Sequence, residues 1–150
     1  MNGETAILLV EDNPSDAKLT LRCLGSKGAG IKIDHVRDGQ AALDYLFCEG
    51  SFAERDPGLG PRLVLLDIKL PKLDGLTVLE RVRADPRTAA LPIVILTSSK
   101  QEGDIANSYH LGVNSYIVKP VDYAKFNEAV RNIGTYWLRT NTQPALLGRA

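Results

Sequence analysis

The chain has few cysteines, no long apolar run and no excess of charge of either sign. Its 150 residues include two cysteines, Cys23 and Cys48, and no CxxC pair, so the sequence predicts neither a disulfide framework nor a cysteine-bound metal. The 18 basic and 18 acidic residues cancel, which gives no electrostatic case for nucleic-acid binding. The apolar runs are too short to cross a membrane, and the amino-terminal residues do not resemble a secretion signal. These absences favour a single cytoplasmic domain with reduced thiols.

Short apolar runs alternate with helical patterns along the chain. The candidate strands cover residues 6–10, 31–36, 63–67, 92–97 and 115–118. A segment with apolar residues at helical spacing follows each of them, and the last such segment carries one stripe made of Phe126, Val130, Ile133 and Trp137. This alternation predicts βαβ units and an α/β fold with a doubly wound parallel sheet of five strands and five helices. A sheet of this size commonly takes the order 2-1-3-4-5.

Two segments fall outside the regular elements. Residues 49–61 are rich in glycine and proline and predict a long loop. We expect the folded domain to cover residues 5–138 and to be followed by a flexible tail over residues 139–150, where polar residues, proline and glycine predominate.

Polar residues stand where four of the apolar runs end. Glu11 and Asp12 follow the first run, Asp67 ends the third, Thr97 ends the fourth and Lys119 follows the fifth. In open α/β sheets, ligands gather beyond the carboxyl ends of the strands. Each residue alone has an ordinary explanation as a helix cap, a turn former or a surface residue. Their joint placement at one sheet edge predicts a functional site.

Three close carboxylates repel one another unless a cation lies between them. Mg²⁺ suits the set because it prefers oxygen ligands, keeps several waters and takes one or two carboxylates. Asp12 and Asp67 are the candidates for direct ligands, and Glu11 would act through water or charge. The backbone carbonyl of Lys69, two residues after Asp67, is a further candidate ligand.

Asp67 is the candidate nucleophile of this site. A carboxylate can attack a phosphoryl group and form an aspartyl phosphate. Mg²⁺ and the ammonium of Lys119 would neutralise the transferring oxygens, and the hydroxyl of Thr97 would donate a hydrogen bond to one of them. A cis bond between Lys119 and Pro120 would aim the lysine across the site, but the sequence leaves that question open.

The segments LLVEDNPSD, LVLLDIKLPKLDGL, IVILTSS and NSYIVKP resemble the receiver domain of bacterial response regulators. The resemblance covers roughly residues 5–138 and implies a flavodoxin-like fold, Mg²⁺ dependence and phosphorylation of Asp67 by the phosphohistidine of a sensor histidine kinase. It implies a conformational switch made of Thr97 and Tyr116, and no enzymatic activity beyond Mg²⁺-dependent self-phosphorylation and autodephosphorylation. Lys69 and Ser99 are placed to tune the lifetime of the phosphate.

A narrower resemblance points to single-domain regulators that pair with bacterial or cyanobacterial phytochromes. It is carried by the long loop, by the stretch DPRTAALPIVILTSS and by the terminal TYWL. We expect no output domain after the receiver, so the signal would leave through protein contacts or onward phosphotransfer. We also expect a homodimer through the helix over residues 101–111, the strand over 115–118 and the last helix, because Tyr136, Trp137 and Leu138 cannot all face the core.

Three alternatives stay open. A phosphorylation-independent interaction module could use the same fold. An aspartate-nucleophile phosphatase would need a second acid where Lys69 stands, and a flavin binder would need a phosphate cradle where acids stand. His35 and His110 are expected to be surface or edge residues away from the strand ends that build the site.

Overall fold

The computed structural model describes residues 4–25 and 31–144 of the chain. The strands are β1 (Ile7–Val10), β2 (Ile33–Val36), β3 (Leu63–Leu66), β4 (Ile93–Thr97) and β5 (Ser115–Val118). The helices are α1 (Pro14–Gly25), α2 (Gly39–Leu46), α3 (Gly75–Ala84), α4 (Glu102–His110) and α5 (Tyr123–Thr135). The long loop forms two short 3-10 turns, η1 (Gly50–Phe52) and η2 (Pro57–Leu59), and a π-helical turn, η3 (Tyr136–Thr140), extends α5. The predicted alternation of strands and helices is confirmed.

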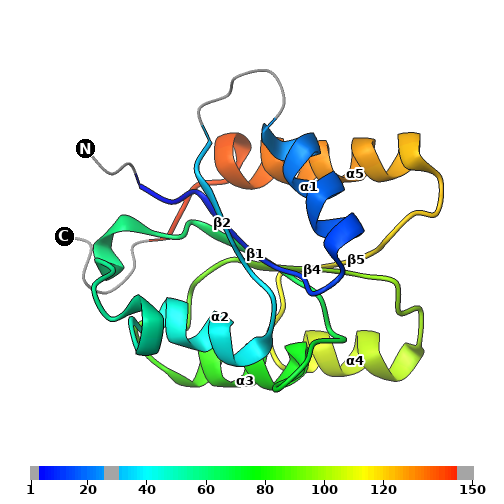
Figure 1. Ribbon diagram of the computed structural model, residues 1–150. Coiled ribbons are helices and arrows are strands. Elements are labelled where there is room, and N and C mark those ends of the chain that lie inside the picture. The colour runs from blue at the N-terminus through cyan, green and yellow to red at the C-terminus, as the bar shows by residue number, and fades with distance from the viewer. Residues whose placement is uncertain (1–3, 26–30, 145–150) are drawn as a thin grey trace.

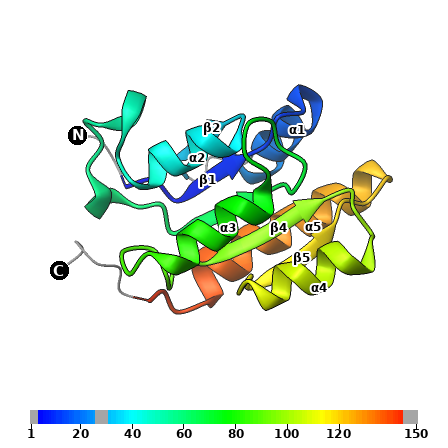
Figure 2. The same cartoon turned by 90° about the horizontal axis from the view of Figure 1, so that it is seen from below.

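The five strands form one parallel sheet in the order β2-β1-β3-β4-β5, as predicted. Helices α1 and α5 cover one face, and α2, α3 and α4 cover the other (Figure 1). Seen from below, α2, α3 and α4 lie side by side across the sheet (Figure 2). The order makes β1 and β3 neighbours, with Val10 opposite Leu66, so the residues that follow these two strands leave the sheet side by side.

Two apolar clusters fill the space between the sheet and its helix layers. Every residue of β1, β3 and β4 is buried, whereas β2 is partly exposed, as expected of an edge strand. On α5 the predicted stripe packs against the sheet, with Phe126, Val130 and Ile133 buried. Burying one such large side chain contributes roughly 1.5–3 kcal/mol, so packing of these amphipathic faces fixes the helices on the sheet.

The start of α3 lies against the end of β3. Asp74 caps the helix by accepting a hydrogen bond from the Thr77 amide at 2.9 Å. The next residue is Gly75, and a Cβ atom there would lie 2.2 Å from the backbone oxygen of Asp67. Only glycine allows this approach, which holds the loop after Asp67 close to the sheet.

Some expectations concern the connections rather than the core. Within the described residues the cis peptide bond joins Gly60 and Pro61, so the Lys119–Pro120 bond is trans. The flexible tail stays a prediction: the helical turn η3 continues to Thr140, and residues 145–150 lie outside the described part. No helix of the described part combines the length and apolar character that a membrane span requires.

Candidate functional site

One ammonium group joins the ends of three strands and the first turn of α1. The Nζ atom of Lys119, just after β5, donates hydrogen bonds to Glu11 Oε1 at 2.6 Å, Asp16 Oδ2 at 2.9 Å and Asp67 Oδ2 at 3.0 Å. The Lys119 and Asp67 side chains are each 9% exposed, and that of Glu11 is 4% exposed. The parallel sheet therefore brings Glu11, Asp67 and Lys119 together, as their positions after the strands predicted.

The second oxygen of Asp67 is held by different donors. Thr97 Oγ1 at the end of β4 donates to Asp67 Oδ1 at 2.7 Å, and the Lys69 amide donates to the same atom at 3.2 Å. Thr97 is fully buried. These two donors orient one oxygen of Asp67, the carboxylate that is the candidate nucleophile.

The charges of the site do not cancel. Burial acts to lower the pKa of Lys119, but its hydrogen bonds to Glu11 and Asp16 and the charge of Asp67 outweigh burial, so the pKa lies above its ordinary value. Burial raises the pKa of Glu11, and the charge of Asp67 raises it further against the opposing effect of Lys119. Three carboxylates around one ammonium leave a formal charge of two negatives, which matches a divalent cation.

The acidic residues fit a Mg²⁺ ion that takes few ligands from the protein and keeps several waters. Asp12, the other predicted ligand, is exposed at the rim beside Glu11. Among the described residues, no three acidic, histidine or cysteine side chains form a ready-made chelate. Mg²⁺ usually binds through one or two carboxylates and keeps several waters, so it does not need such a chelate. Asp12, Asp67 and the carbonyl of Lys69 therefore remain the expected ligands.

The predicted switch residue Tyr116 lies on β5 beside the β4–α4 loop. Its hydroxyl donates to the backbone oxygen of Ser99 at 3.0 Å. The Ser99 hydroxyl in turn donates to Asp104 Oδ2 in the first turn of α4. Lys69 Nζ lies 3.9 Å from the same carboxylate, but its side chain is 67% exposed, so this ion pair contributes little to stability. These contacts connect the loop after Thr97 to α4 and β5.

Two neighbours of the site were not predicted from the sequence. Asp16 was missed: its amide donates to Asn13 Oδ1 at 3.0 Å, so Asn13 caps α1 and Asp16 lies in the first helical turn, and no sequence pattern places that turn next to Lys119. The expectation that His35 lies away from the site was wrong. Its Nε2 atom lies 2.8 Å from the backbone oxygen of Glu11.

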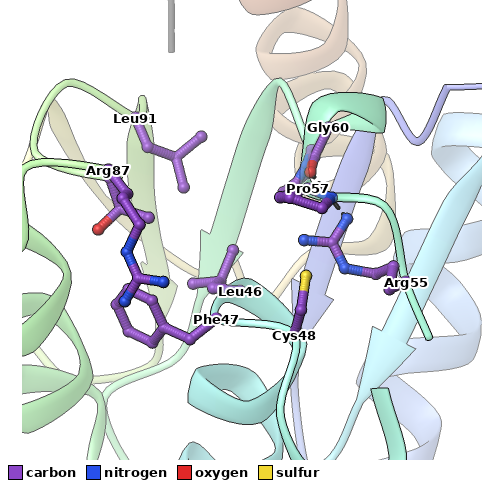
Figure 3. Close-up of a pocket in the computed structure, with 10 residues that line it drawn as sticks. Leu46, Phe47, Cys48, Arg55, Pro57, Gly60, Arg87 and Leu91 are labelled. Carbon is purple, nitrogen blue, oxygen red and sulfur yellow. Dashed lines mark hydrogen bonds between the residues drawn. The ribbon is translucent and has the colours of Figure 1, made fainter. Parts of the chain in front are cut away.

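A cavity of about 280 Å³ lies at the opposite edge of the sheet, between the end of α2, the long loop and the segment before β4. Figure 3 shows Arg55 and Arg87 on opposite sides of it, with Leu46 and Cys48 between them. Both guanidinium groups already have protein partners: Arg55 donates to the carbonyls of Tyr45 and Gly60, and Arg87 pairs with Asp85. None of the residues that line the cavity belongs to the acidic site, so the cavity contributes nothing to that site.

Comparison with known proteins agrees with this geometry. Residues 7–131 match the family described as the response regulator receiver domain. The chain belongs to the response regulator receiver family. Receivers of this family act in two-component signalling, and the flavodoxin-like fold expected of them is confirmed.

The relatives of this receiver include phytochrome-associated regulators. The chain is similar to the probable methanogenesis regulatory protein FilR2 of Methanothrix harundinacea, with 42% identity over 92% of this chain and 86% of that protein. It is similar to the phosphorylated cyanobacterial phytochrome response regulator RcpA, with 38% identity, a TM-score of 0.88 and coverage of 95% of this chain and 100% of that one. The Mn²⁺-bound form of response regulator Rcp1 has 36% identity, a TM-score of 0.86 and coverage of 94% and 99%. The predicted resemblance to phytochrome-associated regulators is confirmed.

Proposed function

We propose that this chain is the phosphoacceptor of a phosphorelay and that Asp67 receives the phosphoryl group from a sensor histidine kinase. The observation that carries the proposal is the environment of Asp67. It is a buried carboxylate at the carboxyl edge of the sheet, with one oxygen bonded to Thr97 and the other to Lys119. These are the donor types that a phosphoryl group needs on its oxygens.

In the proposed transfer, an oxygen of Asp67 attacks the phosphorus atom of the phosphohistidine. The bond between phosphorus and the histidine nitrogen breaks, and the imidazole leaves and takes up a proton. The Lys119 ammonium balances charge on the transferring group, and the Thr97 hydroxyl, now directed at Asp67, turns to a phosphoryl oxygen. Asp12, Asp67 and the carbonyl of Lys69 would hold Mg²⁺, which neutralises phosphoryl charge when bound, with Glu11 acting through water.

Intact mass after incubation with acetyl phosphate tests the chemistry. Wild type should gain one phosphoryl group only when Mg²⁺ is present, and Asp67→Asn should gain none. Rapid hydrolysis could hide the product, so binding of beryllofluoride, followed by NMR, provides the second measurement. No added mass and no beryllofluoride binding would contradict the proposal and favour a phosphorylation-independent interaction module.

We propose a phytochrome-type histidine kinase as the donor because a regulator named for a cyanobacterial phytochrome matches nearly the full length of this chain. The test is phosphotransfer from a purified, autophosphorylated phytochrome kinase to wild type, with Asp67→Asn as the control. The relative FilR2 makes this test necessary, because its name refers to methanogenesis and not to a phytochrome. Transfer from an unrelated kinase but not from the phytochrome kinase would contradict the pairing.

The surface formed by α4, β5 and α5 is the proposed homodimer interface. Large side chains on these elements are exposed: Tyr109 on α4 is 52% exposed and Tyr123 on α5 is 54% exposed. Two neighbours are exposed as well, Val121 just before α5 at 99% and Tyr136 in η3 at 49%. Strand β5 is the outer strand on this side of the sheet and is only partly buried. Covering such side chains favours association because apolar surface leaves water.

Sedimentation with and without beryllofluoride tests the dimer. Wild type should sediment as a dimer at high micromolar concentration, and Tyr123→Glu should shift it toward monomer. Leu59→Glu is the matched control, because Leu59 is 37% exposed in the long loop away from this surface. A wild type that stays monomeric under both conditions would rule out the interface.

A further inference from the structure

His35 lies on the edge strand β2 and reaches the end of the neighbouring strand β1. Its Nε2 atom lies 2.8 Å from the backbone oxygen of Glu11. A carbonyl oxygen can only accept a hydrogen bond, so the Nε2 atom must carry the hydrogen and donate it. An imidazolium also carries hydrogen on Nε2, so the bond exists in either protonation state of the ring.

The Glu11 oxygen needs this donor because the strand ladder ends there. The Glu11 amide donates to the Val36 oxygen at 3.1 Å, and a continued parallel ladder would have the residue 38 amide donate back to the Glu11 oxygen. Asp38 instead caps α2, accepting a bond from the Ala41 amide, and within the described residues no backbone amide reaches that oxygen. The imidazole of His35 takes its place.

The bonded oxygen belongs to the peptide group that joins Glu11 to Asp12. This group is planar, so holding its oxygen fixes the direction in which the chain leaves for Asp12. The Glu11 side chain has its own anchors, namely Lys119 and the Asn13 amide. Asp12 is exposed, and its carboxylate has no partner among the described residues, so its position depends on the backbone.

We propose that His35 is a positioning residue for the cation-binding acids and acts on Asp12 through the Glu11 carbonyl. This inference rests on the proposed metal chemistry. Without the imidazole, the peptide group between the acids is free to rotate, and Asp12 spends less time directed at the cation. Losing one hydrogen bond of this kind corresponds to a decrease in cation affinity of roughly threefold to tenfold.

Mn²⁺ titration followed by EPR of the free ion tests the proposal in four proteins. Wild type and His110→Leu should bind equally, because His110 is an exposed histidine on α4 and serves as the matched control. His35→Leu should bind more weakly. His35→Gln should recover most of the affinity, since its amide nitrogen occupies nearly the place of Nε2. Equal unfolding midpoints would show that the fold is intact, and an NMR shift of the Asp12 amide in His35→Leu would report the reoriented peptide group.

The outcomes separate the inference from the function on which it depends. A wild type that binds Mn²⁺ together with an unchanged His35→Leu affinity overturns the inference alone, as does a His35→Gln variant no better than His35→Leu. A wild type that binds no Mn²⁺ overturns the metal chemistry and the inference with it. If His35→Leu does not fold, His35→Asn replaces it, because its amide is too short to reach the Glu11 oxygen.

Discussion

Replacing Lys119 by methionine should destabilise the fold, because the lysine ammonium holds three carboxylates of the site together. The substitution keeps most of the side-chain volume and removes the ammonium that bonds to Glu11, Asp16 and Asp67. Removing one partner of a buried ion pair costs about 3–5 kcal/mol. The Asp16 side chain is 36% exposed and water can replace its bond, so we expect the lower end, about 3 kcal/mol. For a domain of this size that corresponds to a decrease in Tm of roughly 6–12 °C.

The loss should depend on pH. The pKa of Glu11 in the fold is raised above its ordinary value of 4.5 by burial and by Asp67, so wild type loses stability as pH rises from 4.5 through the raised pKa. Without Lys119 that pKa rises further, and the deficit of the variant grows over the same window. The pKa of Lys119 is itself raised above 10.5, so its contribution is complete below that pH and is lost only as pH rises through the folded value. The deficit should therefore be larger at about pH 8 than at about pH 5.

Urea unfolding at the two pH values, without divalent cations, measures the effect. Lys125→Met is the control, because Lys125 is exposed on α5, and it should change stability by no more than about 0.5 kcal/mol. A Lys119→Met deficit below about 1 kcal/mol at about pH 8 would refute the reasoning, since exposed ion pairs contribute that little. A deficit that is larger at the acidic pH would refute the proposed role of Glu11.

Two further predictions concern residues around the site and behind it. Gly75→Ala should lower the free energy of unfolding by about 1–3 kcal/mol and slow phosphorylation, because its Cβ would meet the Asp67 backbone oxygen. Gly103→Ala is the control: its Cβ would enter open space, so the change should be neutral or stabilising by up to roughly 1 kcal/mol. Urea unfolding and intact mass compare the two variants. Burial and a hydrogen bond to Asp34 raise the pKa of Tyr45 to about 12. The free energy of unfolding of wild type should therefore fall by on the order of 2 kcal/mol between pH 10 and 12, and Tyr45→Phe should lack this decrease. Equal alkaline profiles of these two proteins, measured by urea unfolding, would contradict that assignment.

The sheet could be predicted because its information is local. Each buried strand is a short aliphatic run, and the partly exposed β2 alternates polar and apolar residues as an edge strand does. The right-handed crossover rule and the length of the chain then limit the strand order. Asp67, Thr97 and Lys119 were found because a residue at the end of a parallel strand, or directly after it, has its location set by that strand.

Asp16 and His35 could not be predicted in the same way. Asp16 meets Lys119 because the lysine side chain extends from the end of β5 to the first turn of α1, a contact that no sequence pattern states. His35 reaches the Glu11 carbonyl because the ladder between β1 and β2 ends as Asp38 turns into α2. Both contacts depend on where one element ends relative to another, and such boundaries are the least certain part of any prediction from sequence.

The long loop lies at the amino ends of the strands and the acidic site at their carboxyl ends, so the length of the strands separates the two. The strands have four or five residues, which places the edges roughly 13–17 Å apart. Loops that pack away from a rigid site tolerate insertions and deletions better than the elements that hold it. Residues 49–61 can therefore diverge among relatives, and change what this edge offers to other molecules, while the distances between Asp67, Thr97 and Lys119 stay the same.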